Sequence, residues 1–561
     1  MVTEYIESEK LWRSQKLEIN FSSLGKAILD KLTESCLTNP DRVLEVYHEN
    51  GSKLTVEDAR CQTITVAQNL LKIGVKEGDT VILYSRPNLK ITPISFACYL
   101  IGAAVNFFDI NLEQDVINYS FEKLNPTVII FEQEFKTKTL KAIECVNPPK
   151  LKFILSCNSH QPSSVDEVLF KTTAEIESFQ APEISDPFTV PAFLAFTSGS
   201  TGMPKIAIHS HAMVLQGLYN GWWQLPPQSV VCILCDLRWI CQIEMTLQPV
   251  FFDVKRVCTT TREKDLTGEL EADIIHTQGV THYSVVPMLL LDLLRNVQES
   301  GKISILDSLQ SVLLIGEVVP EPLLPYAKKI LPNCKVIKCY GMTELPGMVV
   351  SDEMEIENQS NLNGGGALKD GFMVKIIDED GNKLGPNQKG RLLFNSEVPI
   401  LGYLKDDKAN KLVFVDEEGW FDTQDYAFMD DNKLLNLVTR SKFLLRSSTK
   451  TIVPSEVENI MTGHESVLAC ALIGHPDPVQ LDDDIGTVFV VLKNHQNVVD
   501  DEVETDLKTF LKTKLTEEQL QIVRFLRVIS ELPLTTCSKV NRKKLKTIAA
   551  TEMSEKYSLL F

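Results

Sequence analysis

Between about residue 40 and residue 440, short runs of apolar and β-branched residues alternate with amphipathic stretches. The apolar runs have the length of buried strands, and the stretches between them carry apolar residues at helical spacing. Because parallel strands need a crossover that a helix usually supplies, this alternation predicts parallel sheets covered by helices. The expected strands include residues 80–84, 128–131, 153–155, 230–234 and 311–315, and the expected helices include 56–71, 94–105 and 287–297.

Two changes of pattern divide the chain. From residue 371 to residue 402 the sequence reads as antiparallel hairpins, with strands at 374–377 and 391–394 and a turn at 378–382. Near residue 441 another α/β pattern begins, with helices at 455–462 and 503–515 and strands at 469–473 and 485–492. We therefore expect an α/β protein with a large N-terminal domain (1–440) of helix-covered mixed or parallel sheets plus a small β element (about 371–440), and a smaller C-terminal α/β domain (441–561).

Composition excludes several classes of protein. The chain has 561 residues, 44% hydrophobic and 23% charged, which is ordinary for a globular protein and excludes a disordered or fibrous one. Its net charge of −19 repels polyphosphate backbones and anionic headgroups, so we expect no nucleic-acid partner. The thirteen cysteines are spread along the chain and suit a reducing compartment. Oligomeric state is open.

The same composition bears on location. The first twenty residues contain no apolar stretch of signal-peptide length, so secretion is not expected. The longest apolar segment, 94–105, is shorter than the roughly twenty residues that a bilayer crossing needs, and we expect a buried helix there and no transmembrane segment.

The most informative stretch, residues 196–205, reads Phe-Thr-Ser-Gly-Ser-Thr-Gly-Met-Pro-Lys and follows a strand-like run at 192–195. Glycines allow close approach of the backbone to an anion, hydroxyls donate hydrogen bonds, and the lysine adds charge, so the stretch predicts a phosphate-binding loop. Its spacing differs from that of the common nucleotide hydrolases. A flexible surface linker is the alternative. The candidate residues are Thr197, Ser198, Gly199, Ser200, Thr201, Gly202 and Lys205.

The loop, with His211 after it, resembles the signature of the adenylate-forming superfamily, which includes acyl-CoA synthetases, beetle luciferases and peptide-synthetase adenylation domains. Further motifs follow in the family's order and are similar to its adenine and magnesium motif, its ribose motif, its hinge and its catalytic-lysine motif. They are Tyr340-Gly341-Met342-Thr343-Glu344, Gly419-Trp420-Phe421 with Thr423 and Asp425, Arg440-Ser441-Lys442, and Ser538-Lys539-Val540-Asn541-Arg542. The chain resembles insect luciferase-like acyl-CoA synthetases more than peptide-synthetase modules.

The resemblance implies an AMP-forming acid–CoA ligase: a carboxylate, expected to be a fatty acid, attacks the α-phosphate of ATP, and CoA then displaces AMP. It implies that Lys539 bridges carboxylate and phosphate, that Thr343 donates to a phosphate oxygen, and that Glu344 holds Mg²⁺. In isolation, Lys539 would be a solvated lysine of a basic tail, and Thr343 a helix N-cap.

The remaining roles are implied in the same way. Tyr340 and Gly341 would bind adenine, Asp425 and Arg440 the ribose, and Lys442 would be the hinge of a mobile C-terminal domain. Trp239 falls where relatives line the acyl pocket, although a buried tryptophan is as often plain core. A metal or redox role for Cys232 and Cys235, or a ligand pair at His209 and His211, is the weaker alternative to packing.

Several positions depart from the family's pattern. Ile206, Gln424, Thr449 and Ser538 stand where glycine is usual, and Arg391 stands where glutamate is usual. A side chain in place of glycine can narrow a passage or disfavour a positive φ, so thioester formation is expected to be weakened while adenylation survives. The alternatives to a ligase are a luciferase-like monooxygenase and a catalytically weakened nucleotide-binding relative. Relatives are often peroxisomal, but the chain does not end in Ser-Lys-Leu, so peroxisome and cytoplasm both remain open.

Overall fold

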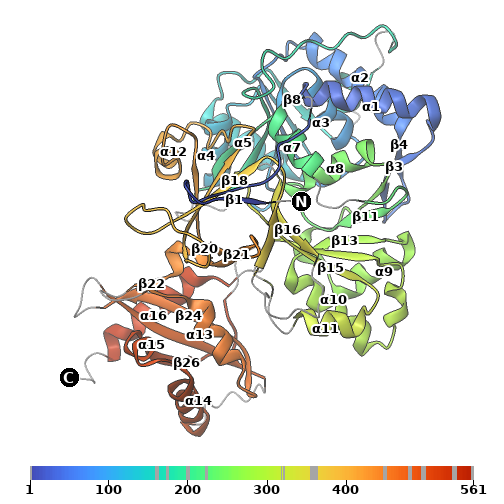
Figure 1. Cartoon of the computed structure of the whole chain (residues 1–561). Helices are drawn as coiled ribbons and strands as arrows, with labels where there is room; N and C mark the ends of the chain where they lie inside the picture. The colour runs from blue at the N-terminus through green and yellow to red at the C-terminus, as the bar shows by residue number, and fades with distance from the viewer. Residues whose placement is uncertain are drawn as a thin grey trace. The chain divides into compact units, whose positions relative to one another are not determined.

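The structure is a computed structural model of the chain (Figure 1). It describes residues 3–19, 21–157, 163–171, 176–197, 203–220, 225–316, 319, 323–345, 347–353, 364–446, 451–477, 483–493, 501–533 and 540–556. These form two compact units, Met1–Lys375 with Leu393–Asp422, and Ile376–Leu392 with Thr423–Phe561. The division passes through three β strands rather than between residues 440 and 441, and the functional boundary at 440 stays a prediction.

The first unit contains a six-stranded sheet in the order β10-β9-β6-β5-β7-β8. Its five strands from β9 to β8 run parallel, and β10 is antiparallel to β9. Side chains alternate between its faces: Val81 and Leu83 pack in one hydrophobic cluster, while Ile82 and Tyr84 pack in another. The strands are β5 (Thr80–Tyr84), β6 (Ala104–Phe107), β7 (Val128–Phe131), β8 (Phe153–Ser156), β9 (Pro191–Thr197) and β10 (Lys205–Ser210).

A second sheet of the same unit has a parallel centre in the order β15-β14-β13-β11-β12-β3. Antiparallel strands extend it at both ends, β16 beside β15 and β4 beside β3. The strands are β3 (Val43–Tyr47), β4 (Lys53–Thr55), β11 (Val230–Ile233), β12 (Lys255–Cys258), β13 (His282–Val285), β14 (Ser311–Leu314), β15 (Lys335–Gly341), β16 (Met348–Glu353) and β17 (Gly364–Leu368), the last paired with β16.

Helices cover both sheets. The largest hydrophobic cluster joins residues of both sheets through α1 (Leu24–Thr38), α2 (Val56–Lys72), α3 (Ile91–Leu100), α7 (His211–Asn220) and α8 (Cys241–Phe251). Helices α4 (Gln114–Leu124) and α5 (Lys136–Val146) cover the other face of the first sheet. Helices α9 (Gly268–Gln278), α10 (Pro287–Glu299) and α11 (Leu323–Ile330) cover the other face of the second. Helix-covered parallel sheets are confirmed.

The hairpin region supplies β18 (Phe372–Ile377), β19 (Gly390–Ser396), β20 (Phe421–Met429) and β21 (Leu435–Arg440). Strand β18 pairs with β2 (Leu11–Arg13), which pairs with β1 (Glu4–Ile6), so the first two strands of the chain extend this antiparallel element at one end. Helix α12 (Asp407–Val413) lies between β19 and β20 in the chain. The predicted small β element is confirmed.

The second unit is built on a three-stranded sheet in the order β24-β25-β26. Leu472 and Val488 pack against the helices of one face, and Ile473 and Phe489 pack with α16 on the other. Its elements are β22 (Leu445–Arg446), β23 (Thr451–Ile452), α13 (Pro454–Thr462), β24 (Val467–Pro476), β25 (Asp484–Leu492), α14 (Asp501–Lys514), α15 (Glu517–Ile522), β26 (Val523–Val528) and α16 (Arg542–Lys556). The second α/β pattern is confirmed.

One predicted helix is wrong in its second half. Helix α3 ends at Leu100, and Ala104 and Val105 belong to strand β6. The break lies at Gly102, whose φ of +74° favours glycine and ends the helix. The apolar run of residues 94–105 therefore hides a buried helix followed by a buried strand, which share the same composition.

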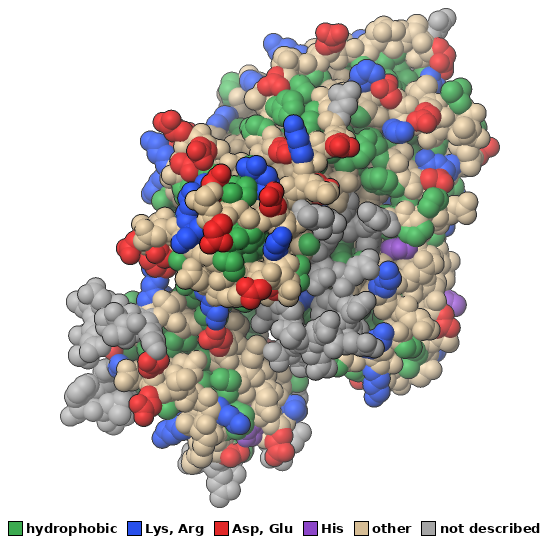
Figure 2. Space-filling model, viewed as in Figure 1, with side chains coloured by type: hydrophobic (Ala, Val, Ile, Leu, Met, Phe, Trp, Pro, Cys, Tyr) green, Lys and Arg blue, Asp and Glu red, His purple; other side chains and the backbone are tan. Residues whose placement is uncertain are grey.

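Among the described residues, no helix has the length and apolar character needed to cross a bilayer. On the face drawn in Figure 2, acidic and basic side chains are interspersed rather than gathered by sign. The excess of acidic residues in the sequence is therefore not visible there as a single acidic patch.

Candidate active site

The predicted phosphate loop connects the two strands of an antiparallel hairpin. Thr197 ends β9, Lys205 begins β10, and the two residues are paired across the ladder. The predicted strand before the loop is confirmed, and the loop leads into a second strand rather than into a helix. Ser198, Gly199, Ser200, Thr201 and Gly202 lie outside the described residues.

Lys205 and Glu344 contact the same tyrosine. The Lys205 ammonium lies over the ring of Tyr403, 4.5 Å from its centroid. The hydroxyl of Tyr403 donates to Oε1 of Glu344 at 2.6 Å, and both of these side chains are buried. Two predicted site residues that are far apart in the sequence are thus brought together by Tyr403, which no motif had marked.

A second contact fixes the segment before Glu344. The Nε2 atom of His209, on β10, lies 2.7 Å from the carbonyl oxygen of Thr343. Burial lowers the pKa of His209 to about 4, so its ring is neutral near pH 7, and Nε2 must carry the proton because a carbonyl only accepts. His209 therefore holds the Thr343–Glu344 turn against the strand that follows the phosphate loop.

The predicted adenine and magnesium motif begins at the end of a parallel strand. Tyr340 and Gly341 close β15, and the ladder to β16 shifts register between them. The Tyr340 ring is buried and stacks against Phe394, with centroids 6.1 Å apart. Thr343 and Glu344 lie in a turn in which the amide of Leu345 donates to Met342. The alternative of Thr343 as a helix N-cap is therefore wrong.

The predicted ribose residues form a pair in the second unit. Asp425 on β20 faces Arg440 on β21, and Nε of Arg440 lies 2.9 Å from Oδ1 of the buried Asp425. The amide of Asp425 donates to the hydroxyl of Thr423, which itself donates to the carbonyl of Leu392. This arrangement fixes the Asp425 carboxylate and makes it able to accept from two adjacent hydroxyls.

Two departures from the glycine pattern differ in their cost. Ile206 sits in β10 opposite Phe196 and is buried among apolar neighbours, so the strand suits it. Gln424, in β20, has a φ of +60°, the left-handed conformation that costs an L-residue about 1–2 kcal/mol. Glycine would relieve strain at residue 424.

Several predictions cannot be placed. Lys539, Ser538 and Thr449 lie outside the described residues. Lys442 is exposed in a short 3₁₀ turn inside the second unit, with its ammonium 5.1 Å from the Phe443 ring centroid. Its role as a hinge stays a prediction.

Trp239 lies in the segment between β11 and α8 and packs against an apolar cluster. That cluster includes Ile233 on β11, Leu313 on β14 and Ile337 on β15, three parallel strands of the second sheet. Cys235, a candidate metal or redox residue together with Cys232, lies beside Cys241, with the two sulfurs 3.7 Å apart. His211 accepts from the amide of Leu24 and is fully buried, a packing role.

Two matches to protein-family models identify the family of this chain. The AMP-binding enzyme family matches residues 32–404, and the AMP-binding enzyme C-terminal domain matches residues 456–539. The chain belongs to the AMP-binding enzyme family. This confirms the resemblance to the adenylate-forming superfamily.

Known members of this family resemble the chain along most of its length. A 2-succinylbenzoate–CoA ligase of Oceanobacillus iheyensis is 25% identical over 530 residues, covering 92% of this chain and 98% of that protein. Acyl-CoA synthetase 7 of Caenorhabditis elegans is 25% identical over 483 residues, covering 83% and 86%. The structure of ATP-bound MatB from Rhodopseudomonas palustris shares the fold, with a TM-score of 0.81, 16% identity, and coverage of 94% and 99%.

The donor set at Glu344 suits the magnesium ion that the resemblance to the adenylate-forming superfamily implies. One Glu344 oxygen accepts from Tyr403, and Thr343, which also carries a side-chain oxygen, precedes Glu344 in the chain. In the part of the chain that the structure describes, no group of three or more His, Cys, Asp or Glu side chains could hold a metal by itself. A single carboxylate fits Mg²⁺, which keeps waters and nucleotide phosphates as its other ligands.

Proposed function

We propose that the protein is an AMP-forming acid–CoA ligase that activates a fatty acid. The observation that carries the proposal is the convergence of Lys205, Glu344 and Thr343 through Tyr403 and His209. A cation that ends the phosphate loop and a carboxylate suited to Mg²⁺ then belong to one polar site. Phosphoryl chemistry needs such a site because catalysis there is mainly positioning and charge neutralisation.

In the first half-reaction a carboxylate oxygen attacks the α-phosphate of ATP, forming acyl-AMP and releasing pyrophosphate. The loop amides and Lys205 bind phosphate oxygens, and the Lys539 ammonium neutralises charge on the reacting carboxylate and α-phosphate. Bound Mg²⁺, held by Glu344, would neutralise the charge of the phosphates. In the second half-reaction the thiol of CoA attacks the acyl carbon and AMP leaves.

The apolar cluster beside Trp239 supports a fatty acid as the substrate. Its members Ile233, Leu313 and Ile337 stand on three of the parallel strands, and ligands of α/β sheets bind at the carboxyl ends of such strands. The aligned relatives are named for 2-succinylbenzoate and for acyl groups, so both kinds of acid belong in a substrate panel.

The test is carboxylate-dependent release of pyrophosphate, with hydroxylamine trapping the activated acyl group across acids of increasing length. Lys539→Ala should lower this release by about 10² to 10³ because it removes an electrostatic stabiliser of the transition state. Lys543→Ala is the matched control, since Lys543 is an exposed lysine of the same basic segment on α16. Equal rates in the two variants would contradict the role of Lys539.

The same assay separates the alternatives. AMP formation that rises with CoA marks a ligase, and light emission with a luciferin marks a monooxygenase. Nucleotide binding without pyrophosphate release for any acid would mark a weakened relative and overturn the proposal.

A further inference from the structure

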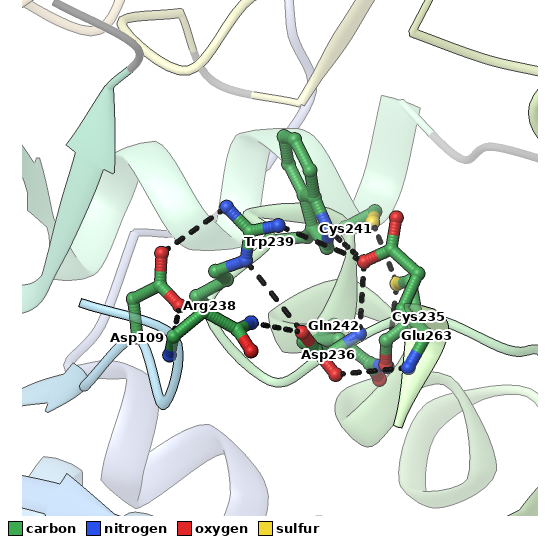
Figure 3. A network of polar contacts seen from close by, with 9 residues as sticks. Asp109, Cys235, Asp236, Arg238, Trp239, Cys241, Gln242 and Glu263 are labelled. Atoms are coloured by element: carbon green, nitrogen blue, oxygen red, sulfur yellow. Dashed lines mark hydrogen bonds and ion pairs between the residues drawn. The ribbon is translucent and has the colours of Figure 1, made fainter. Parts of the chain in front are cut away.

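The indole of Trp239 is held by two charged side chains (Figure 3). Its ring nitrogen donates to Oε2 of Glu263 at 2.6 Å. The Arg238 guanidinium lies over the ring, with its central carbon 4.4 Å from the centroid. A charge-assisted hydrogen bond at the edge and a cation on the face leave the ring little freedom to turn.

Arg238 is itself held by carboxylates. Its guanidinium lies 3.2 Å from Asp109, 3.8 Å from Asp236 and 3.9 Å from Glu263, and all four side chains are less than one-fifth exposed. The backbone closes the network, because the amide of Glu263 donates to Asp236 at 3.2 Å. The residues come from three segments, which follow strands β6, β11 and β12.

This network stands beside the apolar cluster that the proposed function assigns to the acyl chain. Trp239 packs against the apolar cluster that contains Ile233, Met245 and Leu313, on the strands and helix that carry the proposed acyl site. Hydrogen-bonded carboxylates are unusual neighbours for an apolar cluster, and the desolvation that they suffer needs an offsetting role. Fixing the position of one large ring is such a role.

We propose that Glu263 and Arg238 are positioning residues that lock the Trp239 indole as a fixed wall, and that this wall sets the largest acyl group the enzyme accepts. The inference rests on the proposed function. A locked ring cannot swing aside for a longer chain without breaking the bond to Glu263 and the stacking on Arg238. Substrate size is then limited by polar groups that do not touch the acyl chain.

The test measures kcat/KM for a series of straight-chain acids with the full chain. Trp239→Ala should shift the profile to longer acids, raising the ratio of long-acid to short-acid kcat/KM by about tenfold or more. Glu263→Ala should shift it in the same direction, because the indole is released although the ring is still present. The change should appear mainly in KM for the long acids, since the groups that act on phosphate are untouched.

Two further variants separate positioning from general damage. Glu263→Gln keeps an oxygen that accepts from the indole, so it should restore the wild-type profile. Glu134→Gln is the matched control, because Glu134 bonds Arg262 and Arg86 nearby. Where Glu263→Ala does not fold, Trp239→Phe removes the same hydrogen bond and should relax the profile as well.

The outcomes distinguish this inference from the function on which it rests. If none of the acids tested makes the wild-type chain release pyrophosphate, the proposed function fails. If the wild-type chain is active and Glu263→Ala and Trp239→Phe keep its length profile within twofold, the lock is overturned. If Glu263→Gln and Glu263→Ala shift the profile equally, the hydrogen bond does not fix the ring and the inference is also overturned.

Discussion

Tyr403 has two distinct attachments, and they can be separated by one substitution. Its ring lies under the Lys205 ammonium, and its hydroxyl bonds the Glu344 carboxylate. Removing only the oxygen keeps the ring and its packing, so the loop lysine keeps its neighbour. Glu344 then loses a short hydrogen bond in a buried position, where bonds to charged groups are worth about 1.5–3 kcal/mol.

Tyr403→Phe should therefore lower kcat/KM for pyrophosphate release by roughly thirtyfold, which corresponds to about 2 kcal/mol, while the protein stays folded. Tyr326→Phe, which removes an exposed hydroxyl bonded to Gln298, should leave the rate unchanged. Steady-state kinetics of both variants, with circular dichroism as the folding check, decide the matter. A Tyr403→Phe rate within threefold of wild type would contradict the role of the hydroxyl.

Residue types alone could identify only part of the site. Lys205, Thr343 and Glu344 stand in short motifs whose chemistry is local, and so they could be predicted. Tyr403 acts on Lys205 and Glu344 from a distant segment, and no local pattern distinguishes it from a core side chain. His209 stands near Lys205 in the sequence, but its contact with Thr343 joins segments that are far apart in the chain. The contact of Glu263 with Trp239 was invisible for the same reason.

At the scale of elements, short apolar runs predicted the limits of buried strands correctly where turn residues bounded them. Strands β5 and β7 have the predicted limits, because each is a fully buried strand of a parallel sheet. The run of residues 94–105 misled because Gly102 alone separates a buried helix from a buried strand. Gln424, which stands where glycine is usual in the family, has a positive φ within β20.

Gln424→Gly should raise the free energy of unfolding of the second unit by about 0.5–1 kcal/mol. The gain is the relief of about 1–2 kcal/mol of left-handed strain, less about 0.4–1 kcal/mol for the greater freedom of glycine in the unfolded chain. Gln424→Ala should give no gain, since alanine keeps the strain. Urea denaturation of the three proteins provides the comparison, and an equal gain from alanine and glycine would contradict the strain.

Across the whole molecule, buried ionisable groups make stability depend on pH in opposing ways. Burial lowers the pKa of both His209 and His211 to about 4. Between about pH 6.5 and pH 4 these histidines therefore stay neutral in the folded chain, whereas they bind protons in the unfolded chain. Their contribution to stability is complete above about pH 6.5 and is lost as the pH falls from 6.5 to 4. Burial raises the pKa of Glu271 to about 8, and this carboxyl acts in the reverse sense, favouring the folded state as the pH falls.

The histidines can be isolated by substitution. His209→Gln keeps a donor for Thr343, and His211→Asn keeps an acceptor for Leu24, and neither new side chain titrates. Between pH 7.5 and pH 5, wild type should lose about 2 kcal/mol more than each variant. Urea midpoints at the two pH values measure this difference, and parallel pH dependence in all three proteins would contradict neutral burial.

The pairing of Thr197 with Lys205 has a consequence for how this chain can change. The pairing of β9 and β10 extends to the two residues that flank the loop. We therefore expect that the loop sequence can be changed without disturbing the sheet. Random libraries confined to residues 198–204 should then yield soluble, folded proteins at high frequency, of which few retain turnover. Such a library would measure the effect of each loop sequence on folding separately from its effect on catalytic turnover.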